Sequence, residues 1–211
     1  MQPGMIQQWR DDFKVPSAFF GFVEMEPWVG GPTPDFRPAQ LAAMRLPYVG
    51  YGQATDAGDP TGPDGSIHPR NKRLIGGRLA SAALDLQYGV SPAPVWRSPS
   101  YAKGAASANG GTVSVAVSFA DLPTTLVAAA DHCKTELGVP ASQCAWFTIV
   151  GSDGKSYNAT ATPSGSTLVL SAAVPAGTTA AATSFGWNSW PINTVMSAEG
   201  LPLQPWPVTP V

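Results

Sequence analysis

The spacing of hydrophobic and polar positions changes along the chain and predicts two kinds of structure. Residues 17–25 (SAFFGFVEM) form a compact apolar run, typical of a buried strand in a parallel sheet. Residues 38–45 favour a helix with proline in its first turn, and residues 49–54 favour a second short strand. Residues 69–88 repeat apolar side chains at the period of a long helix. Strands and helices in this alternating order indicate an α/β fold.

After about residue 92 the apolar pattern has a period of two. Asn109-Gly110 predicts a tight turn, and the strand expected at 112–119 alternates valine or phenylalanine with small or polar side chains. Short strands separated by such turns are typical of a small β-sandwich. We therefore expect an α/β region at 1–92 and an all-β domain at 93–211. Further strands are predicted at 145–150, 155–162 and 167–173.

Composition agrees with a folded chain of one or two domains. Hydrophobic types make up 44% of the 211 residues and the net charge is only −2, whereas disordered chains combine low hydrophobicity with high net charge. Residues 1–92 hold 17 charged side chains and residues 93–211 hold the other 9. This change, together with the helix stop and prolines at 88–94, places the expected domain boundary at residue 92.

The charge balance argues against several classes of partner. The chain has 12 Lys+Arg against 14 Asp+Glu, which is not the basic field that nucleic-acid binding requires. We expect no nucleic-acid or membrane partner, because no apolar run approaches the ~20 residues of a membrane helix. The densest basic cluster belongs to the predicted long helix and is expected on its solvated face: Arg70, Lys72, Arg73 and Arg78.

The two cysteines, Cys133 and Cys144, are eleven positions apart. A metal site would need more ligands at regular spacing, so a disulfide that closes a short loop is favoured over two free thiols. Asn158 begins an Asn-Ala-Thr sequon for glycosylation. Together these features indicate an extracellular or lysosomal (luminal) protein.

His68 is the histidine with the most suggestive context. Pro69 disfavours a helical conformation at His68 and suits the first position of a helix, which would put His68 at or beside the N-cap. The positive end of a helix disfavours imidazolium, so a neutral ring could accept a proton as a general base. Asp64 or Asp59 could orient the ring. If Asn71 caps the helix instead, the helix dipole acts less strongly on His68. The alternative interpretation of a histidine before a helix is an ordinary surface residue.

The segment around this histidine resembles a known family. Residues 65–89 (GSIHPRNKRLIGGRLASAALDLQYG) are similar to the catalytic-histidine block of the sialate O-acetylesterases, which are SGNH/GDSL-like serine esterases. The resemblance also covers MIQQWR at 5–10, the strand at 17–25, RPAQL at 37–41 and the closing segment at 185–202. It implies the C-terminal portion of an SGNH-like α/β/α domain, joined to a β-sandwich.

The resemblance implies a Ser-His-Asp mechanism on an O-acetylated glycan or sialic acid, with His68 as the base and no cofactor. Such enzymes often carry the orienting aspartate three residues before the histidine, where this chain has Gly65. Asp64 and Asp59 are therefore substitute orienters, or the pair is a Ser-His dyad. The chain also contains no Gly-Asp-Ser or Gly-Gln-Ser nucleophile motif. We expect the serine on an upstream segment or a companion chain.

Two further sets of residues bear on function. Glu24 and Glu26 lie two apart at the end of the first predicted strand, so one or both could contact substrate or His68 rather than serve as ordinary loop carboxylates. Trp187 and Trp190 could stack on sugar rings, although core packing is the commoner fate of tryptophan. They support the alternative hypothesis, a non-catalytic glycan-binding or structural module.

Overall fold

The computed structural model describes residues 2–31, 34–129 and 146–211. The chain divides into two compact units, Met1–Arg97 and Ser98–Val211. The division falls a few residues after residue 92, and the assignment of functional domains to the two parts stays a prediction. No helix in the described ranges is long and apolar enough to span a membrane.

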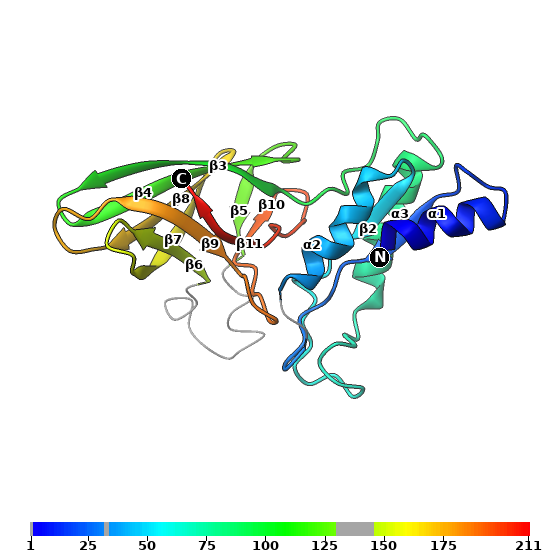
Figure 1. Ribbon diagram of the computed structural model, residues 1–211, viewed down its shortest axis with the longest axis horizontal. Coiled ribbons are helices and arrows are strands. Elements are labelled where there is room, and N and C mark those ends of the chain that lie inside the picture. Colours follow the sequence, from blue (N-terminus) through cyan, green and yellow to red (C-terminus); the bar gives the residue numbers. More distant parts are fainter. Residues whose placement is uncertain (1, 32–33, 130–145) are drawn as a thin grey trace. The chain divides into compact units, whose positions relative to one another are not determined.

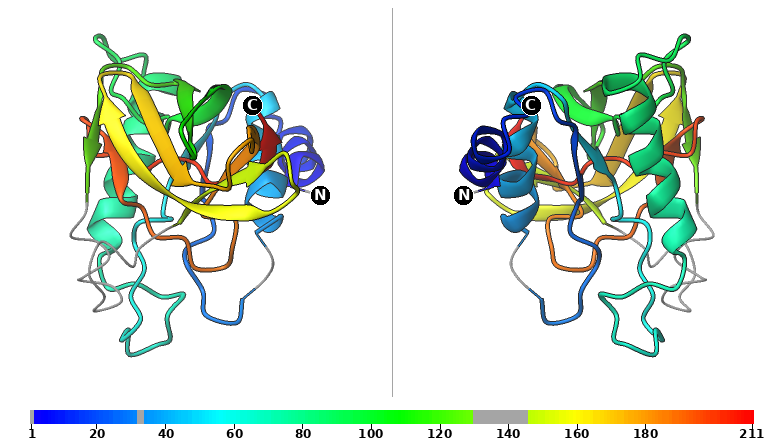
Figure 2. Two further views of the ribbon diagram at one scale, coloured as in Figure 1. Left: turned by 90° about the vertical axis from the view of Figure 1, so that its left-hand side faces the viewer. Right: turned by 90° about the vertical axis from the view of Figure 1, so that its right-hand side faces the viewer.

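The first unit is built around a pair of parallel strands. Strand β1 (Phe20–Val23) pairs with β2 (Val49–Gly52), with Phe20 opposite Val49. Helix α3 contacts one face of the pair, while α1 and α2 lie on the other side (Figure 2, right). Helices on both faces are the usual environment of parallel strands, because these are buried on both sides. The helices are α1 (Gln2–Asp12), α2 (Phe36–Leu41), the 3-10 helix η1 (Ala42–Arg45) and α3 (Lys72–Leu86).

Glycines let α3 approach the strands closely. A Cβ atom at Gly50 would lie 2.8 Å from the Cβ of Ala82, and one at Gly52 would lie 3.0 Å from the Cγ of Leu79. Real Cβ atoms do not tolerate the first distance, so α3 can occupy this position only because the strand has no side chain there. The short GYG sequence of β2 is thus explained by helix packing.

The other face of the strands carries the large side chains of the core. Phe22 and Tyr51 stack with ring centroids 6.0 Å apart, and Ile6 of α1 joins the same buried cluster. Trp96 packs edge-on against Tyr51 and donates its indole N–H to Asp85 of α3. This cluster therefore connects the strands to α1 near the start of the unit and to Trp96 near its end.

The second unit contains a seven-stranded sheet in the order β11-β9-β6-β7-β8-β4-β3, and a separate β10-β5 ribbon (Figure 1). All neighbouring strands are antiparallel, and Figure 2 shows their strong curvature. The bounds are β3 (Ser100–Asn109), β4 (Thr112–Ala120), β5 (Leu126–Ala128), β6 (Phe147–Gly151), β7 (Ser156–Ser164), β8 (Thr167–Ala173), β9 (Ala180–Phe185), β10 (Val195–Ser197) and β11 (Trp206–Pro210).

The curvature brings the two edges of this sheet together, so the sheet is nearly closed. The hydroxyl of Tyr101 on β3 donates to the carbonyl oxygen of Pro210 on β11 at 3.1 Å. Inside, Phe147 and Phe185 stack with centroids 4.3 Å apart and Trp206 packs against both. The alternating valines of β4 complete the core, each of them fully buried: Val113, Val115 and Val117.

The architecture differs from the expected sandwich in one respect. Instead of two separate sheets, β7 pairs with β6 through its first half and with β8 through its second half, which joins the two halves into one sheet. The chain is mostly β, and the antiparallel strands of the second unit agree with the all-β character expected for residues 93–211. The assignment of the first unit to an SGNH-like α/β/α domain stays a prediction.

The packing of α3 gives a test by substitution. Gly50→Ala is expected to lower the free energy of unfolding by roughly 1–3 kcal/mol, because the new methyl group overpacks the contact with Ala82. Gly76→Ala is the matched control. Gly76 is an exposed residue of α3, and a Cβ added there would have no neighbouring atom within 4 Å. Alanine at this position should therefore raise the free energy of unfolding by about 0.5–1 kcal/mol. Urea denaturation measures both, and equal effects would contradict the packing argument.

Candidate active site

The carboxyl ends of β1 and β2 meet at one edge of the first unit. Glu24 follows β1 directly, and its backbone N–H donates to the carbonyl oxygen of Gly52, the last residue of β2. Gln53 and Thr55 follow β2, both fully buried, with the Gln53 amide donating to the Thr55 hydroxyl at 3.1 Å. Ligand sites of α/β proteins form at such an edge.

Helix α2 fixes the path of the chain after β1. The side chain of Gln40 donates to the carbonyl oxygen of Val23 at 3.1 Å and accepts from the N–H of Met25 at 2.8 Å. Arg37 donates to the carbonyl oxygen of Met25. Burial lowers the pKa of Arg37, and the negative charge of Glu24 acts in the opposite direction. Glu24 is itself completely buried, so it serves as a counter-charge inside the unit.

A buried ion pair fixes the path of the chain after β2. Arg78 of α3 donates to the two carboxylate oxygens of Asp56 through its two terminal nitrogens, Nη1 and Nη2, at 2.6 and 2.7 Å. Nη1 also donates to the carbonyl oxygen of Gln53. The expectation that Arg78 lies on a solvated helix face is wrong, since only 6% of its side chain is exposed. The sequence pattern missed this because the partner, Asp56, is distant along the chain.

The loop between β2 and α3 is held by a second aspartate–arginine pair. Asp59 accepts from the guanidinium of Arg70 at 2.7 Å through each carboxylate oxygen, and also from the backbone N–H of Arg70. Arg70 donates in addition to the hydroxyl of Thr61. These hydrogen bonds lower the pKa of Asp59 to about 2. Both oxygens of this predicted orienter are therefore engaged by Arg70 rather than directed at His68.

Helix α3 begins later than the proline pattern predicts. Asn71 is the N-cap, and its side-chain oxygen accepts from the N–H of Leu74 at 3.3 Å. The expectation of Pro69 at the first helical position is wrong, because an asparagine side chain satisfies a free helix amide and proline cannot. His68 precedes the cap by three residues. His68 is therefore not at or beside the N-cap, where the sequence predicted it.

His68 lies exposed on the loop, and its backbone N–H donates to the carbonyl oxygen of Gly65. Within the described residues its ring makes no hydrogen bond, and Asp64 is exposed without one to His68. Ser66 accepts from the N–H of Val29 at 3.3 Å and so ties this loop to the segment after β1. The imidazole is thus accessible from solvent.

Glu26 is a carboxylate whose charge interacts with that of His68. Glu26 is 8% exposed, and the ammonium of Lys72 lies 3.9 Å from one of its carboxylate oxygens. Burial raises the pKa of Glu26, while the charges of Lys72 and His68 lower it. The sequence analysis did not identify Lys72 as a site residue. The available signal was its position, four residues after His68 and within the start of the predicted helix.

Other predicted features belong to the second unit or fall on residues that the structure does not describe. Cys133 and Cys144 are outside the described residues. Asn158 is exposed on β7, and its glycosylation stays a prediction. Trp187 and Trp190 are both half-buried. Among the described residues, no cluster of histidine, cysteine and carboxylate side chains could hold a metal ion.

One solved structure with a similar fold is a carbohydrate acetylesterase from Xanthomonas citri. It has a TM-score of 0.71 and 26% sequence identity, and the match covers 97% of this chain and 44% of that one. This chain therefore corresponds to less than half of the length of that protein. No family model and no curated protein matches the sequence.

The Asp59–Arg70 pair gives a pH-dependent prediction. In the protein the carboxyl of Asp59 should titrate with a midpoint of about 2, and Arg70→Gln should raise the midpoint toward the ordinary value of 3.8. Because folding lowers this pKa, the pair stabilises the fold fully above 3.8, and the stabilisation is lost as the pH falls toward 2. NMR titration of the side-chain carbonyl carbon measures the midpoint. Arg73→Gln is the control, and an equal shift in that variant would refute the assignment.

Proposed function

We propose that this chain is the base-bearing part of a serine esterase that removes acetyl groups from carbohydrates, with sialate-type sugars as the substrate class. The similarity to the Xanthomonas carbohydrate acetylesterase over 97% of this chain is the observation that carries the proposal. The family resemblance of residues 65–89 supports the same activity independently. The proposal concerns the complete enzyme, with the serine nucleophile outside this chain, because these 211 residues contain no Gly-Asp-Ser or Gly-Gln-Ser motif.

The chemistry is acyl transfer in two steps. His68 takes the proton of the serine hydroxyl as the serine oxygen attacks the acetyl carbonyl, and the resulting imidazolium protonates the departing sugar oxygen. Water then attacks the acetyl-serine and loses a proton to His68, which returns it to the serine oxygen as acetate is released. His68 suits this role because it is exposed on the loop that leads from β2 to α3.

Glu26 is the carboxylate best suited to orient and stabilise the imidazolium. Its charge and that of His68 act on each other, and its buried setting beside Lys72 holds it in place. Asp59 is bound by Arg70, and Asp64 is exposed to water, which screens its charge. Asp64 remains the second candidate for this role.

A serine-directed fluorophosphonate probe and an acetate-release assay test the function on the native protein, purified with any polypeptide that accompanies it. We expect labelling of a serine and release of acetate from O-acetylated sugars. His68→Ala should lower both rates by roughly 10²–10⁴-fold, because the general base is lost. His132→Ala, the other histidine of the chain, is the control. Absence of labelling and hydrolysis in the native form would refute the esterase and favour a glycan-binding module.

The role of Glu26 has a separate kinetic test. Glu26→Gln keeps the shape of the side chain and removes its charge, so kcat should fall at least about tenfold, or ~1.4 kcal/mol in transition-state stabilisation. KM should stay unchanged, since an orienting group acts in the transition state. A raised KM with normal kcat would instead show that Glu26 contacts the substrate. The matched variant Asp64→Asn should leave both constants unchanged, and a large fall in its kcat would assign the role to Asp64.

A further inference from the structure

Strand β1 has one paired edge and one open edge. The parallel register with β2 uses the backbone groups of Phe20, Phe22 and Glu24, so it turns those of Gly21 and Val23 to the opposite side. Within the described residues, the N–H groups of Gly21 and Val23 have no hydrogen-bond partner. Both residues are exposed. This edge therefore presents backbone groups in the arrangement that a further strand would pair with.

Two glutamine side chains mark the ends of the open stretch. Gln87, just after α3, accepts from the N–H of Phe19 at 3.1 Å. Gln40 of α2 donates to the carbonyl oxygen of Val23 and accepts from the N–H of Met25. The side chains satisfy the backbone before and after the strand, and they leave the middle of the edge accessible.

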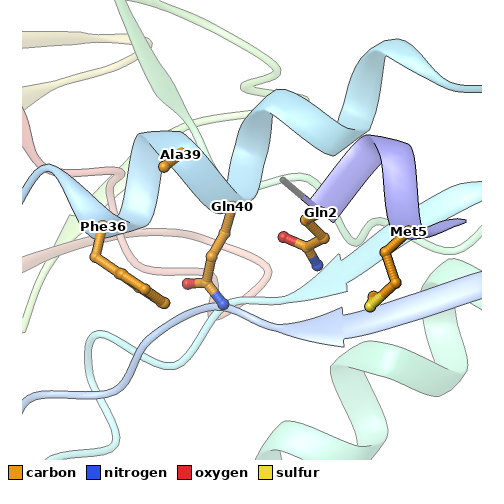
Figure 3. A pocket seen from close by; sticks show the side chains of 5 residues that line it. All are labelled: Gln2, Met5, Phe36, Ala39 and Gln40. Atoms are coloured by element: carbon orange, nitrogen blue, oxygen red, sulfur yellow. The ribbon is translucent and has the colours of Figure 1, made fainter.

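Large apolar side chains surround this edge. Met5 and Trp9 of α1, Val23 of β1 and Phe36 of α2 are each between 37% and 48% exposed. Met5 and Phe36 line a groove of about 370 Å³ with Gln40, and their side chains point into the space beside the strands (Figure 3). We call Met5, Trp9, Gly21, Val23 and Phe36 the open-edge surface. A patch of this kind is usual at an interface and unusual on free solvent-facing surface.

The sequence of β1 lacks the devices that protect a free strand edge. Natural edges carry lysine, proline or a bulge that prevents pairing with another chain. Residues 18–23 (AFFGFV) contain none of the charged or proline residues, and the register with β2 is regular throughout. The edge is therefore adapted to being covered.

We propose that the open-edge surface binds the companion part of the esterase, a polypeptide that adds a strand parallel to β1 and packs apolar side chains into the groove. The inference rests on the proposed function, which needs a serine from outside this chain. The solved esterase supplies the second argument, because this chain corresponds to only 44% of its length. That protein has more than enough additional chain to supply a strand.

A second copy of this chain fits the edge less well. Two copies related by a two-fold axis would pair β1 with its own equivalent, and that pairing is antiparallel. The existing pair is parallel and has helices on both faces, the setting in which sheets are extended by further parallel strands. A second copy would also bring no nucleophile motif.

Hydrogen–deuterium exchange and sedimentation test the proposal on the protein purified from its native host, together with any polypeptide that accompanies it. We expect further polypeptide beyond these 211 residues, either as an upstream segment of the same chain or as an equimolar companion chain. We also expect amides of Gly21 and Val23 that exchange at least 100-fold more slowly than in the isolated 211-residue chain. Val23→Lys and Phe36→Lys should each abolish the association. Leu84→Lys is the matched control, since Leu84 is 40% exposed on α3 and outside the open-edge surface.

Three results would overturn the proposal. The first is a monomer of 21.9 kDa whose Gly21 and Val23 amides exchange rapidly in the native form. The second is a dimer of this chain with protection of the same amides. The third is a complex that survives both lysine variants while circular dichroism shows them folded, because the companion then binds elsewhere. If a lysine variant does not fold, Phe36→Ser is tested in its place, and loss of association is again expected.

The acetate-release assay separates this proposal from the proposed function. A protected edge in an equimolar complex that releases no acetate would refute the esterase and leave the docking surface standing. A monomer with a rapidly exchanging edge that nevertheless releases acetate would refute the docking surface and leave the esterase standing.

Discussion

The candidate site depends on the buried pair between Arg78 and Asp56. A guanidinium that binds both oxygens of a carboxylate and a backbone carbonyl has a fixed direction, so it sets where the chain leaves β2. Removing one partner of a buried pair leaves an uncompensated charge, which typically costs 3–5 kcal/mol. Because α3 carries Arg78 and packs on the glycines of β2, the helix is tied both to the strand and to the residues that follow the strand.

The start of α3 is organised by complementary charges. Arg70 binds Asp59 within the loop, Lys72 approaches Glu26 after β1, and Arg78 binds Asp56 after β2. The exposed Arg70 pair contributes little stability by itself, but it defines the loop that carries His68. Lys72 and His68 both interact with the negative charge of Glu26, and each lowers the pKa of that carboxyl.

The sequence allowed the regular elements to be predicted where packing alone determines the pattern. The strand at 112–119 alternates strictly and matches β4, because one of its faces fills the core. Strand β3 was missed, since its small and polar side chains are mostly exposed and carry no alternation. Helix α1 was missed as well, because its only deeply buried positions are Pro3, Ile6 and Arg10.

The site could be predicted only in part, for a related reason. The proximity of Glu24 and Glu26 to one strand end follows from local sequence, and both do lie at that edge. Which carboxylate lies near His68 depends on the path of the loop, and that path is set by pairs distant along the chain, above all Arg78 with Asp56. Asp59 looked equally suitable in sequence, but a guanidinium in the same loop binds it more strongly than an imidazole would.

The geometry of parallel strands links the open edge to the chemistry. The carboxyl ends of parallel strands lie at the same side of a sheet, so a strand added to β1 would end beside the segment that carries Glu24 and Glu26. A residue placed directly after that strand would then reach the edge where His68 is exposed. Covering the apolar edge and completing the catalytic group would thus be achieved by one docking event. An exposed parallel edge is costly for a folded chain, and this arrangement gives a functional reason for its presence.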